Sequence, residues 1–239
     1  MGKGLYFFPV KFCSQSASFR VPEEHTFQST LPLPPITALK GLVGAAMGLG
    51  FEDAMAFSKA KGLSFGVYGG STGFARDLWK HQKIKSGEVV SSVLTRDLLF
   101  NFNLDLLIVG NEKEVLNAVR TAFLDPHYVL TMGTSDDIAK ILSVGEVDKP
   151  KIISVDVVEK TCLRGNYLDR DLISLDIRTV PLNSIIRPPR VYILPTEYSF
   201  ENEERRLCKK EPFTFVEHSV ELAEPVQGVE YEGKEIPLL

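Results

Sequence analysis

Residues 69–95 combine cationic, aromatic and glycine residues in a way that suits single-stranded RNA. The side chains concerned are Phe74, Arg76, Trp79, Lys80, His81, Lys83 and Lys85. Cations neutralise phosphates, and aromatic rings stack on unpaired bases for roughly 1–3 kcal/mol each. Gly69, Gly70 and Gly73 would also let backbone N–H groups approach phosphates. This stretch is therefore the strongest RNA-binding candidate, and a solvent-exposed loop is the alternative interpretation.

The same stretch could instead support metal-independent RNA cleavage. That reaction needs a base for the 2′-OH, an acid for the leaving oxygen and a cation for the phosphorane. The candidate residues are His81, Lys80 and Tyr68, with Lys83, Tyr128 and His25 as further possibilities. A histidine in a basic loop is usually an ordinary surface residue, so cleavage is the alternative hypothesis.

Other residues could contact an RNA backbone through charge or close approach: Arg20, Lys40, Gly44, Gly133 and Ser135. Lys40 lies near the start of a predicted helix, whose dipole favours an anion at that end. Gly44 belongs to a small-residue helix face that would admit RNA backbone, or a packed helix or strand. Arg20 could bind phosphate or pair with Glu23 or Glu24.

Gly133 and Ser135 lie in a glycine-threonine-serine turn before a predicted short helix. Backbone N–H groups and hydroxyls at a helix start can bind phosphate. Asp136 and Asp137 argue against such binding, because their charges already satisfy the helix N-terminus. A well-capped helix is the equal alternative.

Motifs for metal and cofactor chemistry are missing from the sequence. The three cysteines, Cys13, Cys162 and Cys208, form no CxxC pair, and the four histidines show no metal-ligand spacing. Neither GxxxxGK[ST] nor GxGxxG occurs, which disfavours a phosphate-binding metabolic enzyme. The RNP1 pattern of common RNA-recognition domains is also absent. We therefore expect no metal and no cofactor.

The charge is unevenly distributed along the chain. The formal net charge is −4, which taken alone argues against nucleic acid. Residues 1–100, however, hold 11 Lys and Arg against 7 Asp and Glu, and this asymmetry permits a local anion-binding face. The longest apolar run, residues 42–51, is too short to span a membrane, so a cytoplasmic protein is expected.

The elements that must position these residues follow a recognisable order. Strands are predicted at 5–12, 63–68, 98–108 and 128–132, and helices at 37–47, 52–61, 112–123 and from the 133–137 turn to 142. The β-α-β-β-α-β order predicts an α+β fold with a ferredoxin-like (RRM-like) core, an antiparallel sheet covered by helices on one face. Residues 69–95 form a long insertion between its second and third strands.

The last third of the chain has a weaker pattern. Strands are predicted at 151–158 and 213–222, and prolines interrupt the connections between them. We therefore predict a domain at 1–145, with its insertion at about 69–95, and a smaller, irregular, β-rich region at 146–239.

Three N-terminal motifs resemble those of CRISPR-associated (Cas) protein family five. They are SFRVP at 18–22, QSTLPLPP at 28–35 and KGLVGAAMG at 40–48, a proline-rich loop leading into a glycine-containing first helix. The sequence MGTSD at 132–136 is similar to the "LGxSE" turn of that family, with Met for Leu and Asp for Glu. The resemblance covers about residues 4–145.

The resemblance implies both a fold and a role. The fold is a ferredoxin-like core of the repeat-associated (RAMP) type with a protruding β-hairpin thumb. The role is that of a non-catalytic subunit of a type I (Cascade-like) complex of the I-A/I-B kind. Such a subunit holds the 5′ handle of the CRISPR guide RNA, caps the family-seven backbone filament and contacts the large family-eight subunit in antiviral defence. Members of subtype I-C also cleave precursor RNA with a Tyr-Lys-His set.

Overall fold

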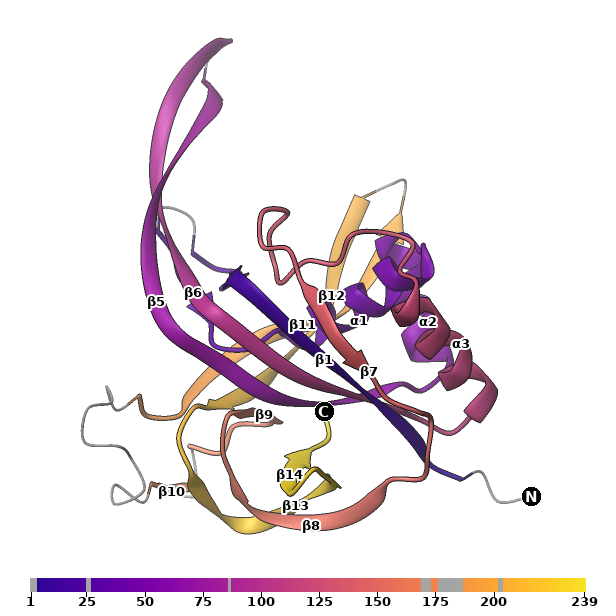
Figure 1. Cartoon of the computed structure of the whole chain (residues 1–239). Coiled ribbons are helices and arrows are strands. Elements are labelled where there is room, and N and C mark those ends of the chain that lie inside the picture. The colour runs from indigo at the N-terminus through magenta and orange to yellow at the C-terminus, as the bar shows by residue number, and fades with distance from the viewer. Residues whose placement is uncertain (1–3, 25–26, 86, 169–172, 176–186, 202–203) are drawn as a thin grey trace.

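The computed structural model describes residues 4–24, 27–85, 87–168, 173–175, 187–201 and 204–239. For His81, Lys83 and Lys85 it describes the backbone only. Sheets dominate the described chain, and three helices accompany them, which confirms the α+β class (Figure 1). None of the helices in these ranges is long and apolar enough to cross a membrane.

The N-terminal sheet is built around β1 (Tyr6–Ala17), which pairs with β6 (Glu88–Gly110) and β7 (Lys140–Val144). β5 (Ser64–Lys85) pairs with the far edge of β6, so the order is β5-β6-β1-β7 with every neighbour antiparallel. A short strand, β3 (Phe27–Gln28), adds parallel to β6 at Thr95 and Arg96. The period-two pattern of residues 98–108 therefore lies in the long central strand β6.

Helices α1 (Ile36–Met47), α2 (Phe51–Ala60) and α3 (Lys113–Leu124) lie together on one side of this sheet (Figure 1). The apolar stripe of α3 is buried, and the ring of its Phe123 lies 6.3 Å from that of Phe8 and 6.0 Å from that of Phe12 on β1. α1 ends at Gly48, whose φ of 75° places it in the left-handed region that glycine adopts easily. All three helices lie within two residues of the predicted ranges.

The C-terminal third is made of strands. They are β8 (Lys151–Val158), β9 (Thr161–Arg164), β10 (Ile173–Leu175), β11 (Arg190–Glu201), β12 (Glu204–Val216), β13 (Val220–Tyr231) and β14 (Lys234–Pro237), while β2 (Phe19–Arg20) and β4 (Thr30–Leu31) form a small pair near the N-terminus. β8, β10, β13 and β14 form one sheet, and β11, β12 and β9 form another. The predicted strand at 151–158 is confirmed, whereas the one at 213–222 spans the end of β12, a turn and the start of β13.

The largest buried cluster joins the two ends of the chain. Leu194, Phe213 and Phe215 from the C-terminal strands lie in the same cluster as Phe8 and Phe102 of the N-terminal sheet. The C-terminal strands thus complete the core of the N-terminal part. The proposed boundary near residue 145 stays a prediction.

The prediction for residues 128–142 is wrong. Residues 128–132 contribute only an isolated bridge between Thr131 and Ile138, and no helix follows them. Asp137 is buried and accepts hydrogen bonds from the hydroxyls of Thr134, at 2.7 Å, and Ser16. These bonds hold the 133–137 turn against β1, so the chain continues along β1 as strand β7.

The 69–95 stretch is the outer part of one hairpin. β5 and β6 stay paired from Ser64 and Val109 to Lys85 and Glu88. Figure 1 shows this hairpin extending far beyond the body of the protein. Asn101 of β6 has a φ of 49°, rare for a residue with a side chain, close to the point where the hairpin leaves the body. The loop interpretation is therefore replaced by a pair of hydrogen-bonded strands.

Candidate nucleic-acid interface

The hairpin divides the predicted RNA-binding cluster between two faces. Side chains of a strand alternate, so Tyr68, Phe74, Arg76 and Lys80 of β5 share one face, here named the groove face. Arg76 confirms this direction, because its Nε lies 3.0 Å from Oδ1 of Asp97, its partner across the hairpin.

The opposite face of the hairpin, here named the outer face, carries Trp79. The guanidinium of Arg96 lies 5.8 Å from the centre of the Trp79 ring and pairs with Asp77 at 3.3 Å. His81, Lys83 and Lys85 follow Trp79 along β5, and their side chains lie outside the described residues. Phe74, Arg76 and Lys80 are therefore brought together, and Trp79 is separated from them.

A hollow of about 270 Å³ lies at the base of the groove face, and we name it the root groove. Phe74 contributes one wall, and the guanidinium of Arg187 lies 5.5 Å from its ring centre. Arg76 lies in the same way 5.0 Å from the ring of Phe27. The Arg187–Phe74 pair and Arg190 thus line the root groove, and the Arg76–Phe27 pair adjoins it through Asp97.

Internal contacts fix the arginines of the root groove without enclosing them. Asp97 is only 5% exposed, whereas the side chain of Arg76 is 60% exposed. Arg76 therefore keeps N–H groups open to solvent while one edge is anchored. Arg187 and Arg190 share Glu217, at 3.2 and 3.0 Å. Oriented guanidinium groups of this kind suit phosphates and base edges.

Sequence reasoning missed Phe27, Arg187 and Arg190. Phe27 immediately precedes the QSTLPLPP motif, and the two arginines flank Pro188 and Pro189. Only the parallel pairing of β3 with β6, and the approach of residues 187–190 to Phe74, bring them to the hairpin. The proline pair between two arginines was the available signal.

A larger cleft, of about 640 Å³, adjoins the root groove, and Pro32 lines both. Tyr68 lies in its wall and donates a hydrogen bond of 2.8 Å to Oε1 of Glu159. Burial raises the pKa of Tyr68 to about 12, and the hydrogen bond to Glu159 adds to this effect. Tyr68 therefore keeps its proton at neutral pH and cannot serve as a base.

Among the described residues, Tyr68 and Lys80 of the alternative catalytic set are not brought together. Tyr68 and Lys80 lie twelve positions apart on β5, a path of roughly 40 Å along an extended strand. The side chain of His81 and all of His25 lie outside the described residues. Tyr128 lies in the loop after α3, its ring edge-on to that of His127 at 4.5 Å. The described geometry thus separates Tyr68 from the Lys80–His81 pair.

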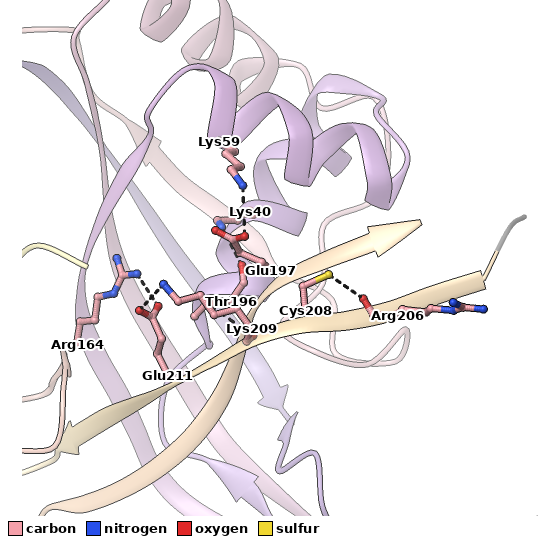
Figure 2. A network of polar contacts seen from close by, with 9 residues as sticks. All are labelled: Lys40, Lys59, Arg164, Thr196, Glu197, Arg206, Cys208, Lys209 and Glu211. Atoms are coloured by element: carbon pink, nitrogen blue, oxygen red, sulfur yellow. Dashed lines mark hydrogen bonds and ion pairs between the residues drawn. The ribbon is translucent and has the colours of Figure 1, made fainter. Parts of the chain in front are cut away.

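Lys40 and Arg20 contact protein groups. Figure 2 shows Lys40 among the polar contacts that join α1 and α2 to β11 and β12, with its Nζ 3.4 Å from the carbonyl oxygen of Thr196. Burial lowers the pKa of Lys40. Arg20 is exposed on β2 and donates to the carbonyl oxygen of Glu24 at 3.0 Å, so it pairs with neither predicted carboxylate there.

Replacing Lys40 by methionine is expected to stabilise the protein at neutral pH, by less than about 1 kcal/mol. A lysine whose folded-state pKa is lowered disfavours folding while it is protonated. The gain should therefore shrink as the pH rises through that lowered pKa towards 10.5. Urea unfolding at pH 7 and pH 10 measures this. Lys59→Met, which removes an exposed pair with Glu197, is the control and should give no gain.

The three remaining predicted residues have mainly structural surroundings. Gly44 is buried, and a Cβ there would overlap that of Ala54 on α2, so helix packing replaces the expected RNA contact. Gly133 has a φ of 110°, and a Cβ there would overlap the carbonyl oxygen of Ser18. Ser135 is exposed, but the helix start expected beside it is absent.

Comparison with protein families gives one match. The family model described as CRISPR-associated protein (Cas_Cas5) matches residues 10–171. No curated protein matches the chain. A chain of a CRISPR RNA-guided surveillance complex is similar in structure, with a TM-score of 0.51 and 16% identity over 92% of this chain and 91% of that one. A chain of a type III-B Cmr-beta complex, bound to cognate target RNA and AMPPnP, gives 0.51 and 12% over 90% and 86%. At these identities the two structures show a shared fold.

Proposed function

Because this chain belongs to the CRISPR-associated protein (Cas_Cas5) family, we propose that it is a non-catalytic, RNA-binding subunit of a type I surveillance complex. It holds the 5′ handle of the guide RNA. The observation that supports this most is the root groove, where Arg187 lies over Phe74 and a second pair, Arg76 over Phe27, adjoins it at the base of a projecting hairpin. Aromatic rings that stack bases, beside cations that meet phosphates, are the usual components of a single-stranded RNA surface.

The proposed RNA path follows the groove face of the hairpin. It begins in the 640 Å³ cleft, passes Pro32 into the root groove and continues past Arg76 towards Lys80. All these positions lie on one side of β5, so a single strand can follow them without crossing the sheet. Arg20, Ser135 and the basic residues beyond Lys80 are proposed as peripheral contacts only.

The fold assignment and the partners belong to the same proposal. The strand order β5-β6-β1-β7, with α1 and α3 following β1 and β6, supports a ferredoxin-like RAMP core whose thumb is the hairpin. The subunit then caps a family-seven backbone filament and contacts the large family-eight subunit. The I-A/I-B subtype is part of this proposal.

The experiment that tests the function is a binding and cleavage assay. Purified protein is mixed with labelled repeat RNA in chelator, beside a His81→Ala variant. We expect salt-dependent binding of intact RNA by both proteins, because Tyr68 is held far from Lys80 and His81 and keeps its proton. Specific cleavage that disappears in the variant would make the protein a processing ribonuclease instead. Absence of RNA binding, alone and with a backbone subunit present, would refute the proposed function.

A further inference from the structure

Lys160 has a backbone conformation that its side chain disfavours. It lies in the turn between β8 and β9 with a φ of 48°, in the left-handed region where glycine is the usual residue. Non-glycine residues persist in such conformations when the surrounding structure holds them there, often at functional sites. The position of Lys160 at the edge of the 640 Å³ cleft is therefore informative.

Two hydrogen bonds hold this turn against β5. The N–H of Gly69 donates to the carbonyl oxygen of Lys160 at 2.8 Å, and the hydroxyl of Thr161 donates to the carbonyl oxygen of Val67 at 2.7 Å. Gly69 is itself constrained, because a Cβ there would overlap the carbonyl oxygen of Asn103. The turn and the strand thus fix the backbone from which the Lys160 side chain enters the cleft.

Lys160 brings a positive charge that the described residues do not neutralise. Its Nζ lies 5.9 Å from the centre of the Tyr68 ring, and no carboxylate in the described ranges lies within ion-pair distance of it. Among the nearby carboxylates, Asp105 pairs with Lys234 and Glu217 binds Arg187 and Arg190. Glu159 accepts a hydrogen bond from the neutral hydroxyl of Tyr68 and keeps its own charge. Of the two lysines that line the cleft, Lys160 is thus the one without a described ion pair, which leaves it open to an anion.

The rest of the cleft offers surfaces for a base and a sugar. Pro32 contributes apolar surface, and Thr72, which shares the groove face of β5 with Tyr68, adds a hydroxyl group. The volume lies within the range of roughly 300–1,000 Å³ that small-molecule sites occupy. A cleft that continues into the root groove suits one unit of a longer ligand better than a free metabolite.

We infer that the cleft binds a single splayed-out nucleotide of the RNA, with Lys160 on its phosphate and Pro32 against its base. This inference rests on the proposed function and adds a defined subsite to it. Unpaired bases that leave the stack are the parts of single-stranded RNA that proteins recognise individually.

Lys160→Gly separates the binding role from a structural one. The variant removes the charge and also relieves the backbone strain, so affinity and stability should change in opposite directions. We expect roughly tenfold weaker binding of labelled repeat RNA, a salt dependence shallower by about 0.7 in slope and an unchanged or higher Tm. Lys160→Arg should keep most of the affinity. Glu232→Gly relieves a φ of 49° in the β13–β14 turn, outside the cleft lining, and removes a negative charge near Lys234, so it should not weaken RNA binding.

Cross-linking locates the nucleotide. Repeat RNAs with single 4-thiouridines are irradiated with the full-length protein and the adducts are mapped by mass spectrometry. We expect one RNA position to cross-link to residues 68–72 or 159–160. Wild-type affinity in Lys160→Gly, or adducts only on the hairpin beyond Phe74, would overturn the subsite while leaving the proposed function intact. Weaker binding of Lys160→Gly without a cleft adduct would also overturn the subsite. Failure of the wild type to bind RNA would refute the subsite and the proposed function together.

Discussion

Replacing Phe74, Arg76 and Lys80 together by alanine is expected to weaken RNA binding by about 100- to 1,000-fold. The loss of one stacked base costs roughly 1–3 kcal/mol, and a tenfold loss of affinity corresponds to about 1.4 kcal/mol. Two phosphate contacts disappear as well, so the slope of log K against log salt should fall by about 1.4. Fluorescence anisotropy with labelled repeat RNA measures the affinity and the salt slope, for the isolated protein or for the assembled complex.

The outer face of the same hairpin supplies a matched control. Trp79→Ala with Arg96→Ala also removes one aromatic ring and one guanidinium, but from the side that faces away from the root groove. We expect this pair to change RNA affinity by less than about threefold. Equal losses from both faces would show that the hairpin binds RNA without a preferred side, and would refute the groove-face path.

The Arg76 substitution needs a folding control, because it leaves a buried carboxylate unpaired. Asp97 is 5% exposed and loses its only described ion pair when Arg76 is removed. Adding Asp97→Asn removes the orphaned charge and should restore the Tm without restoring RNA affinity. Recovery of binding in that combination would mean that misfolding, and not the missing guanidinium, caused the loss.

Long periodic segments of the fold could be predicted from the sequence, and short ones could not. The alternation in residues 98–108 and the stripe of α3 each follow a single period over many residues, so strand β6 and helix α3 were identified. Residues 140–144 are a short, mostly apolar run that fits a helix or a strand. Contacts with β1, made through Asp137 and Ser16, decide between the two, and those contacts are not local in the sequence.

The composition of the candidate site could be predicted, but its arrangement could not. The cations and rings of residues 69–95 were visible, yet neither face of the projecting hairpin is buried along its length. No alternation of apolar residues therefore marked it as a strand, and the opposite positions of Arg76 and Trp79 stayed hidden. Phe27 and Arg187 come from distant parts of the chain, and only tertiary packing brings Phe27 to Arg76 and Arg187 to Phe74.

The motif that spans Gly133 was identified by resemblance, and the structure gives it a physical reason. Gly133 has a φ of 110° and lies directly against the carbonyl oxygen of Ser18, where β1 leads into β2. The same turn ends at buried Asp137, which binds Ser16 of β1. Gly133 thus lets the turn lie flat against the end of β1, which in turn positions β7 at the sheet edge.

Gly133→Ala is accordingly expected to destabilise the protein by about 3–5 kcal/mol. Backbone strain at positive φ accounts for about 1–2 kcal/mol of this, and displacement of the Ser18 backbone accounts for the rest. Gly62→Ala is the control for left-handed strain without a clash, since Gly62 has a φ of 57° with no atom within 4 Å of an added Cβ. Urea unfolding of both variants shows how much more the Gly133 position costs. If Gly133→Ala costs no more than Gly62→Ala, the turn moves freely away from β1, and the close approach has no structural role. If it costs more, hydrogen exchange should show faster opening first in β7, whose place beside β1 depends on that turn.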